Sequence, residues 1–324
     1  MNKNTHLTRT LALVGSVAAV LALGTVAAAD TGATRVYTLT PSTHGNPEGV
    51  AADPISGVFF VAATGDGTIY RGTLGNPNVE EFIPGATGKS AVGLKVARGQ
   101  LYVVGGSTGS VVVYDLLSRR QVASFATGAG GFLNDLAVTS NGDVFVTDSF
   151  RPTLWHITAA QVRAGGGTPE AISVAPEITF QAGFNLNGIV ALDARTLVVV
   201  QSNTGALFRI DLARSGRQIQ QITVDPLVSG DGMLIDRGQL IVVQGATAQL
   251  TFVELDRRAA RGTVVAHVTD PTLRGPSTVA RSRDRYLVVN ADFATSTQPF
   301  TVSSIARGDR DGDDDQDDDS RDDH

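Results

Sequence analysis

Short runs of β-branched and aromatic residues, separated by turns rich in Gly, Asp and Asn, recur along most of the 324-residue chain. Each run covers four to six residues, as at 58–61, 101–104 and 240–243, which is the length and composition of a strand. No stretch of the body sustains the 3.6-residue apolar spacing that a long helix requires. The pattern therefore predicts an all-β fold, with one short helix at about 158–163.

A second pattern repeats six times, each time shortly before a strand run. The stretches that carry it are Pro47-Glu48-Gly49, Ala91-Val92-Gly93, Leu133-Asn134-Asp135, Leu186-Asn187-Gly188, Gly230-Asp231-Gly232 and Pro276-Ser277-Thr278. Their central residues are 44, 42, 53, 44 and 46 positions apart. A period in the forties with several short strands per unit is typical of a β-propeller. We therefore expect a six-bladed propeller over residues 30–307.

The last repeat lacks a candidate for its outermost strand, whereas the apolar segment 35–39 precedes the first repeat and has no place in it. Pairing this segment into the last blade would leave no sheet edge exposed between the first and last blades. We expect an N-terminal strand to close the ring in this way.

In a propeller the innermost strand of each blade lines a central channel, so the repeated positions should face one another. Four of them carry side-chain oxygens, namely Glu48, Asn134, Asn187 and Asp231. Two carboxylates and two amide oxygens suit Ca²⁺ or another divalent cation. Asn-Gly and Asp-Gly are also common hairpin turns, so each dipeptide alone could be a turn. Four in register favour a ring of metal ligands.

These stretches, at these spacings, resemble the gluconolactonase, regucalcin and luciferin-regenerating-enzyme family of six-bladed propellers (the senescence-marker-protein type) over nearly the whole body. The resemblance implies a catalytic divalent ion, usually calcium, on Glu48, Asn134, Asn187 and Asp231. Asp148, in a stretch similar to a family strand, could support that ring or simply form a turn. Sugar-lactone members carry Arg two residues before the Asn of blade three. Here that residue is Phe132, so we expect an apolar wall rather than a site for a sugar acid.

Two functions are compatible with this pattern. The first is a calcium-dependent hydrolase of the lactonase or arylesterase type, in which Asp231 acts as the base toward water or as the nucleophile. The second is a non-catalytic propeller that the ion staples together and whose loops bind a protein or glycan partner. His44, in the loop before Glu48, could reach the mouth of the channel under either hypothesis.

The two ends of the sequence differ from the body. Residues 1–29 have a basic start, an apolar run and an Ala-rich end, which predicts a cleaved signal peptide and a secreted or periplasmic protein; an uncleaved membrane anchor is the alternative. Residues 308–324 contain ten Asp, which predicts a disordered acidic tail, with loose cation binding as the alternative.

Charge and cysteine content narrow the range of functions. The leader contributes +2 and the tail −8 to the total of −6, so the body is neutral and has no sign of a nucleic-acid surface. The chain has no cysteine, which excludes cysteine nucleophiles, thiolate metal sites and disulfides. We expect a monomer that binds a small-molecule substrate and, after cleavage of the leader, does not insert into a membrane.

Overall fold

Strands dominate the part of the chain that the computed structural model describes, residues 33–212 and 217–308. The expected signal peptide and all of the expected acidic tail except Gly308 lie outside these residues. Four of the sheets have four strands each, in sequence order. They are β6–β9 (Leu94–Ala97, Gln100–Val104, Ser110–Asp115, Gln121–Ala126), β10–β13 (Leu133–Val138, Val144–Asp148, Thr153–Ile157, Glu170–Ser173), β14–β17 (Leu186–Ala191, Thr196–Gln201, Ala206–Asp211, Gln218–Gln221) and β18–β21 (Gly230–Asp236, Gln239–Gln244, Gln249–Leu255, Gly262–Thr269).

The remaining strands form one eight-stranded sheet from the two ends of the described chain, in the order β2-β3-β4-β5-β1-β24-β23-β22. Their bounds are β1 Arg35–Thr40, β2 Pro47–Ala52, β3 Val58–Ala63, β4 Ile69–Thr73, β5 Asn76–Ile83, β22 Pro276–Ser282, β23 Arg285–Asn290 and β24 Thr301–Ala306. Strand β1 pairs antiparallel with β24, with Arg35 opposite Ser304, so the expected closing strand is present. It also pairs in parallel with β5, a contact that the strand pattern did not predict.

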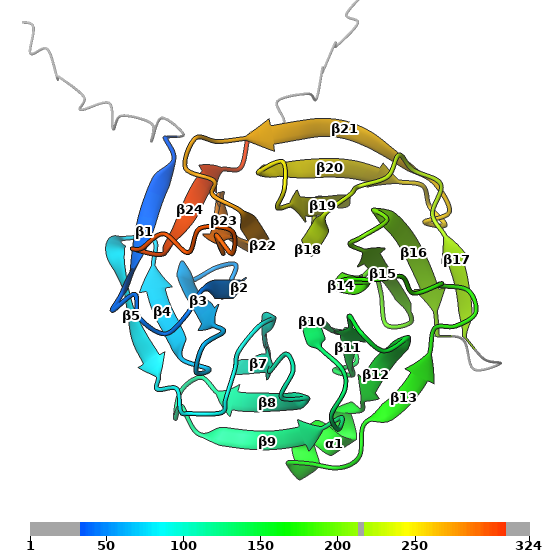
Figure 1. Ribbon diagram of the computed structural model, residues 1–324, viewed down its shortest axis with the longest axis horizontal. Coiled ribbons are helices and arrows are strands. Elements are labelled where there is room, and N and C mark those ends of the chain that lie inside the picture. Colours follow the sequence, from blue (N-terminus) through cyan, green and yellow to red (C-terminus); the bar gives the residue numbers. More distant parts are fainter. Residues whose placement is uncertain (1–32, 213–216, 309–324) are drawn as a thin grey trace, which may run out of the picture. The chain divides into compact units, whose positions relative to one another are not determined.

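Each sheet packs face to face against its neighbours in sequence, and Figure 1 shows the strands β2, β10, β14, β18 and β22 around a common centre. Strands inside the sheets, such as β11 and β19, are buried along their whole length, as expected for strands covered on both faces. The first and last repeats share one such cluster, in which Phe59 and Tyr70 pack with Leu287 and Val302. The apolar layers therefore run from sheet to sheet around the centre.

The described residues contain a single α-helix, α1 at Ala159–Ala164, close to the predicted position. Thr158 caps its N-terminus and exchanges side-chain and backbone hydrogen bonds with Gln161, as in a capping box. Among these residues no helix is long and apolar enough to cross a membrane.

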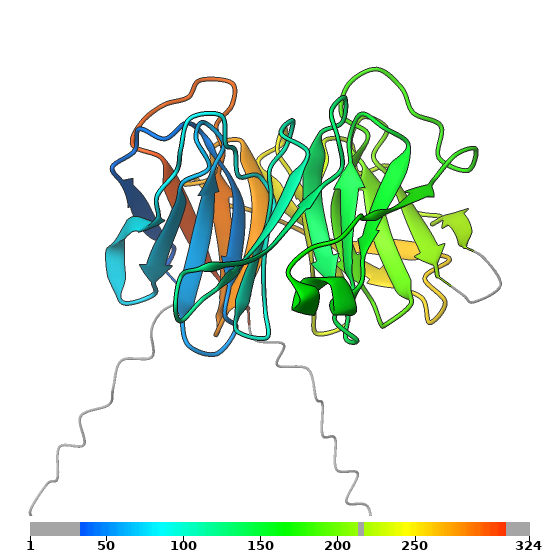
Figure 2. The same cartoon turned by 90° about the horizontal axis from the view of Figure 1, so that it is seen from below.

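Two long loops rise from the same end of the sheets, as Figure 2 shows in green for 174–185 and in orange-red for 291–300. The first loop precedes the innermost strand β14, and the second joins β23 to β24. They carry side chains of the cavity described next.

Candidate functional site

The four predicted ligand residues lie at the same place in four innermost strands. In each strand the pairing with the next strand shifts register at the predicted residue, between Pro47 and Val50 in β2, for example. The same shift occurs in β10, β14, β18 and β22. A bulge of this kind turns a side chain out of the regular alternation of the strand. It explains how Glu48, Asn134, Asn187 and Asp231 can all point toward the centre.

Gly49 and Gly188, which follow Glu48 and Asn187, are required because the neighbouring repeat approaches closely, and neither forms a turn. A Cβ on Gly188 would lie 2.1 Å from the carbonyl oxygen of Asp231, and one on Gly49 would lie 2.2 Å from that of Val92. Both glycines are strand residues without positive φ. The turn interpretation of Asn187-Gly188 is therefore wrong, whereas Asn141-Gly142 does form a turn, with φ of 93° at Gly142.

Hydrogen bonds to main-chain carbonyl groups of the innermost strands link neighbouring repeats around the centre. Gly93 N–H donates to the carbonyl oxygen of Asn134 at 3.0 Å, and the hydroxyl of Thr147 donates to that of Asn187 at 2.6 Å. The hydroxyl of Ser277 donates to the carbonyl of Glu48 at 2.6 Å and so joins the last repeat to the first. These bonds join the second repeat to the third, the third to the fourth and the sixth to the first.

The four side chains meet in one cavity of about 690 Å³. Glu48 Oε2, Asn134 Oδ1, Asn187 Oδ1 and Asp231 Oδ1 are all shielded from solvent and have no hydrogen-bond partner. A buried polar atom without a partner costs about 1–3 kcal/mol, so four of them facing one space form a set that a bound cation would satisfy. Because all four are oxygens, the set fits a hard divalent cation such as Ca²⁺.

Two serines determine which way the amides face. Ser149 Oγ donates its one proton to the carbonyl of Leu186 at 2.6 Å, so it can only accept from Asn134, and Nδ2 of Asn134 lies 3.0 Å away. Ser202 Oγ likewise donates to the carbonyl of Gly230 and accepts from Asn187 Nδ2 at 3.3 Å. A hydroxyl has a single donor. Both amide oxygens must therefore point into the cavity.

The two carboxyls are held in an environment that favours a bound cation. Burial raises the pKa of Asp231 to about 8, and the charge of Asp135 adds to this effect. Burial also raises the pKa of Glu48 well above its ordinary value, with further contributions from Asp231 and Asp135, partly offset by Lys95. Lys95 pairs with the buried carboxyl of Asp135 at 3.2 Å. The positive charge of a bound divalent ion would offset both the burial of the two carboxylates and the repulsion between them.

No group of three or more His, Cys, Asp or Glu side chains within 33–212 and 217–308 is arranged to hold a metal. The quartet includes only two carboxyls, so it depends on its amide oxygens. That combination is the one predicted from the repeat pattern.

Other predicted residues have different positions from those expected. His44 does not line the cavity: its Nδ1 lies 2.6 Å from Asp66 and its Nε2 lies 2.8 Å from Glu81. Asp148 is fully buried and accepts from the backbone of Phe132 and the side chain of Arg151, at 3.0 and 2.7 Å. Hydrogen bonds of this kind outweigh the effect of burial and lower its pKa. It anchors loops and has no hydrogen bond to Asn134.

The aromatic wall expected from Phe132 is present, and it is larger than the sequence indicated. Phe184 and Phe293 also line the cavity, together with the hydroxyls of Ser90, Ser107 and Ser229. Phe184, Phe293 and Ser107 lie in loops with no periodic signal, so sequence patterns could not identify them. Ser90 and Ser229 stand two residues before the central residue of their repeats, the position that Phe132 has in the third repeat. Ser149 and Ser202 do share a signal: each directly follows the second strand of its repeat.

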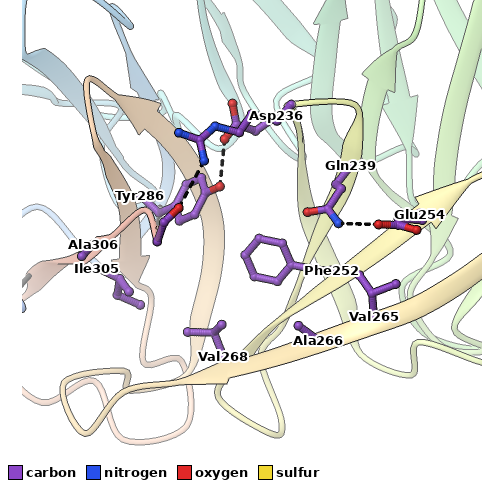
Figure 3. Close-up of a pocket in the computed structure, with 12 residues that line it drawn as sticks. Asp236, Gln239, Phe252, Glu254, Val265, Ala266, Val268, Tyr286, Ile305 and Ala306 are labelled. Atoms are coloured by element: carbon purple, nitrogen blue, oxygen red, sulfur yellow. Dashed lines mark hydrogen bonds between the residues drawn. The ribbon is translucent and has the colours of Figure 1, made fainter. Parts of the chain in front are cut away.

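A second cavity, of about 350 Å³, lies beside β18–β21 and β24 and is shown in Figure 3. Its polar groups bind one another: Tyr286 donates to Asp236 at 2.8 Å and Gln239 donates to Glu254 at 3.1 Å (Figure 3). These pairs leave no group that calls for a ligand. The cavity with the four unpartnered oxygens is therefore the candidate site.

Solved structures with similar folds exist at low sequence identity. The major allergen Mala s 1 of Malassezia sympodialis has a TM-score of 0.64 and 14% identity, covering 81% of this chain and 93% of that one. A luciferin-regenerating enzyme has a TM-score of 0.61 and 13% identity, covering 85% and 95%. Virginiamycin B lyase from Staphylococcus aureus has a TM-score of 0.58 and 11% identity, covering 85% and 99%. Their shared fold is of the propeller type.

This likeness shows the propeller fold of the chain and nothing finer. No protein-family model matches the sequence, and no curated protein matches it either. The neighbours include proteins named as a regenerating enzyme, a lyase and an allergen, and one fold supports many functions. The function has to be argued from the cavity.

Proposed function

We propose that this chain is a secreted or periplasmic calcium-dependent hydrolase that acts on a lactone or another ester. The observation that carries the proposal is the convergence of four buried, unpartnered oxygens, from Glu48, Asn134, Asn187 and Asp231, on one cavity. We also propose that the eight-stranded sheet is two blades joined edge to edge through β1 and β24. With the four other sheets this makes a six-bladed propeller.

The cation would be held by the four oxygens, and another divalent ion could replace calcium. When bound, it supplies a positive charge that polarises an acyl carbonyl and stabilises the oxyanion of the transition state. The serines behind Asn134 and Asn187 keep both amide oxygens turned toward it. The bulged strands and their glycine contacts hold the oxygens on a rigid backbone.

Asp231 is the residue to which we assign proton transfer. Hydrolysis adds one water across the acyl C–O bond, and a base takes a proton from that water as its oxygen bonds to the carbonyl carbon. The same proton then passes to the leaving alkoxide as the C–O bond breaks, giving an acid and an alcohol. Because Oδ1 of Asp231 is one of the four oxygens that would hold the cation, we assign the proton to the other oxygen of the same carboxyl, which belongs to a residue that lines the cavity. Direct attack by this carboxylate on the carbonyl is the alternative path.

The proposal is tested with lactones and aryl esters, each assayed with calcium and with excess chelator. We expect hydrolysis that chelator abolishes and calcium restores. Asp231→Asn should lower kcat by about 10²–10⁴-fold and retain measurable calcium binding by calorimetry. Full activity of this variant would exclude the assigned role.

A different outcome would favour a non-catalytic protein. Calcium bound at about one ion per chain, without chelator-sensitive hydrolysis of any substrate in the panel, is expected if the ion only staples the inner strands. The loops above the cavity would then bind a protein or glycan partner. We further propose a monomer that binds neither nucleic acid nor a membrane, which light scattering and sedimentation with each partner would check.

A further inference from the structure

Three phenylalanines form one cluster at the mouth of the cavity. The ring of Phe132 lies 5.2 Å from that of Phe184, edge to face, and 5.6 Å from that of Phe150, while Phe150 and Phe184 are 5.2 Å apart. They come from loops before β10, after β11 and before β14. Phe150 is 49% exposed and Phe184 is 45% exposed. Aromatic side chains this open form a face that can take a further apolar group.

Phe293 adds a fourth ring from the loop between β23 and β24, and it is 58% exposed. Figure 2 shows this loop and the loop that carries Phe184 at the same end of the sheets. The cavity is thus bordered by aromatic side chains from both loops. A single exposed Phe would be ordinary, but Phe132, Phe184 and Phe293 line the same cavity as the four oxygens.

The charges of the cavity restrict what can bind. Of the described residues that line it, only Glu48 and Asp231 are ionisable, and none is Lys, Arg or His. The other polar groups are hydroxyls and amides, including Ser90, Ser107 and Ser229. An anionic substrate would find no basic side chain here, and a polyol would face aromatic rings.

The cluster is also held in place from behind. Asp148 accepts from the backbone N–H groups of Phe132 at 3.0 Å and Phe150 at 3.1 Å, and from the indole of Trp155 at 3.2 Å. Arg151, paired with Asp148, donates to the carbonyl of Thr127 at 2.9 Å. One buried carboxyl therefore fixes both phenylalanine loops. A preorganised wall of this kind loses little entropy on binding.

We propose that this aromatic cluster is a subsite for an aryl or comparably bulky apolar group on an uncharged carbonyl compound, whose carbonyl then faces the four oxygens. The substrate class deepens the proposed hydrolase function and rests on it for the reaction. The binding preference does not depend on turnover, so it can be tested separately.

The test compares two carboxamides that resist hydrolysis, 2-phenylacetamide and gluconamide, by calorimetry with calcium present. Trp155 is the only tryptophan of the chain and bonds to Asp148, so its fluorescence gives a second readout. We expect the aryl amide to bind at least about tenfold more tightly, as the burial of one aromatic group predicts. Phe184→Ser should lower that affinity about tenfold with only a small fall in the urea midpoint, because the ring is 45% exposed.

Leu117→Ser is the matched control, since Leu117 is 95% exposed and does not line the cavity; it should change neither affinity. Equal binding of the two amides, or unchanged binding in Phe184→Ser, would overturn the subsite. Tight binding of the aryl amide, with no hydrolysis of phenyl acetate, would refute the hydrolase and leave the subsite standing. Hydrolysis without aryl preference would do the reverse.

Discussion

Asn134 and Ser149 form a pair in which a hydroxyl decides the orientation of an amide. Ser149 gives its proton to the carbonyl of Leu186 and accepts from Asn134 Nδ2, so Asn134 Oδ1 faces the cavity. The same arrangement recurs at Asn187 and Ser202. The orientation of the two amide oxygens thus depends on serines that are not among the four proposed ligands.

Removing this hydroxyl should weaken calcium binding. In Ser149→Ala the amide of Asn134 loses the partner that distinguishes its two ends, so it can turn its NH₂ group inward. We expect the calcium affinity to fall by about 10–100-fold, as for other groups that orient metal ligands. Calorimetric titration measures the change. Ser107→Ala is the control, because Ser107 lines the cavity and has no hydrogen bond to either Asn, and an equal loss in both variants would contradict the account.

The glycine contacts predict a strong effect on stability. Gly188→Ala places a methyl group 2.1 Å from the carbonyl oxygen of Asp231, so β14 and β18 must move apart. We expect a loss of about 2–4 kcal/mol in the free energy of unfolding, measured by urea denaturation. Gly75→Ala is the matched control, because its Cβ meets nothing within 4 Å. A Gly188→Ala protein as stable as the control would show that the strands are not this close.

Calcium should stabilise the folded protein by mass action. Because the four oxygens converge only after folding, calcium at 100 times its dissociation constant should add about 2.7 kcal/mol to the free energy of unfolding. The difference between calcium and chelator in thermal or urea unfolding gives this value. It should disappear in Asn187→Leu, which loses one oxygen ligand. A calcium effect that persists in this variant would place the ion elsewhere.

His44 gives a pH dependence of stability that is separate from the cavity. Burial lowers its pKa, but the hydrogen bonds and charges of Asp66 and Glu81 more than offset this, so its pKa is raised above 6.5. The stabilisation is therefore complete below pH 6.5 and is lost as pH rises through the folded-state pKa. His44 is 22% exposed at its side chain, so the effect should be under about 1 kcal/mol.

The contribution of His44 to stability is measured as the difference in the free energy of unfolding between wild type and His44→Asn across pH 5.5–9. The stability difference should shrink as pH rises, and Glu81→Gln should reduce the pH-dependent part. A difference that grows with pH would reverse the assigned sign.

Periodicity was sufficient to predict most of the strands and the convergence of four oxygen-bearing side chains, whereas their role as metal ligands stays a prediction. Glu48, Asn134, Asn187 and Asp231 could be found because one strand position per repeat must face the centre, and the structure places all four on one cavity. The dipeptide Asn187-Gly188 was ambiguous, since a hairpin turn and a close approach both favour Gly. The carbonyl oxygen of Asp231, which leaves no room for a Cβ on Gly188, distinguishes the close approach from the turn.

Residues and contacts that do not recur in the repeats could not be predicted from the sequence. Phe184 and Phe293 lie in loops, whose paths depend on tertiary contacts such as those of Asp148. The parallel pairing of β1 with β5 arises because the closing strand β1 lies between β24 and β5 in the sheet. His44 had a plausible position near the mouth, but the carboxylates that hold it lie in distant turns and strands.

The pairing of β1 with β24 has a consequence for how the molecule must be made. Arg35 lies opposite Ser304, so the earliest described strand has to wait for the latest one. Closure is also what brings the hydroxyl of Ser277 to the carbonyl of Glu48, and with it the glutamate to the other three oxygens. An N-terminal fragment emerging from a ribosome lacks this last structural partner, because β24 has not yet been synthesised. The proposed cation would then be captured only after synthesis is complete, and a truncated chain should be recognisable by its failure to retain calcium.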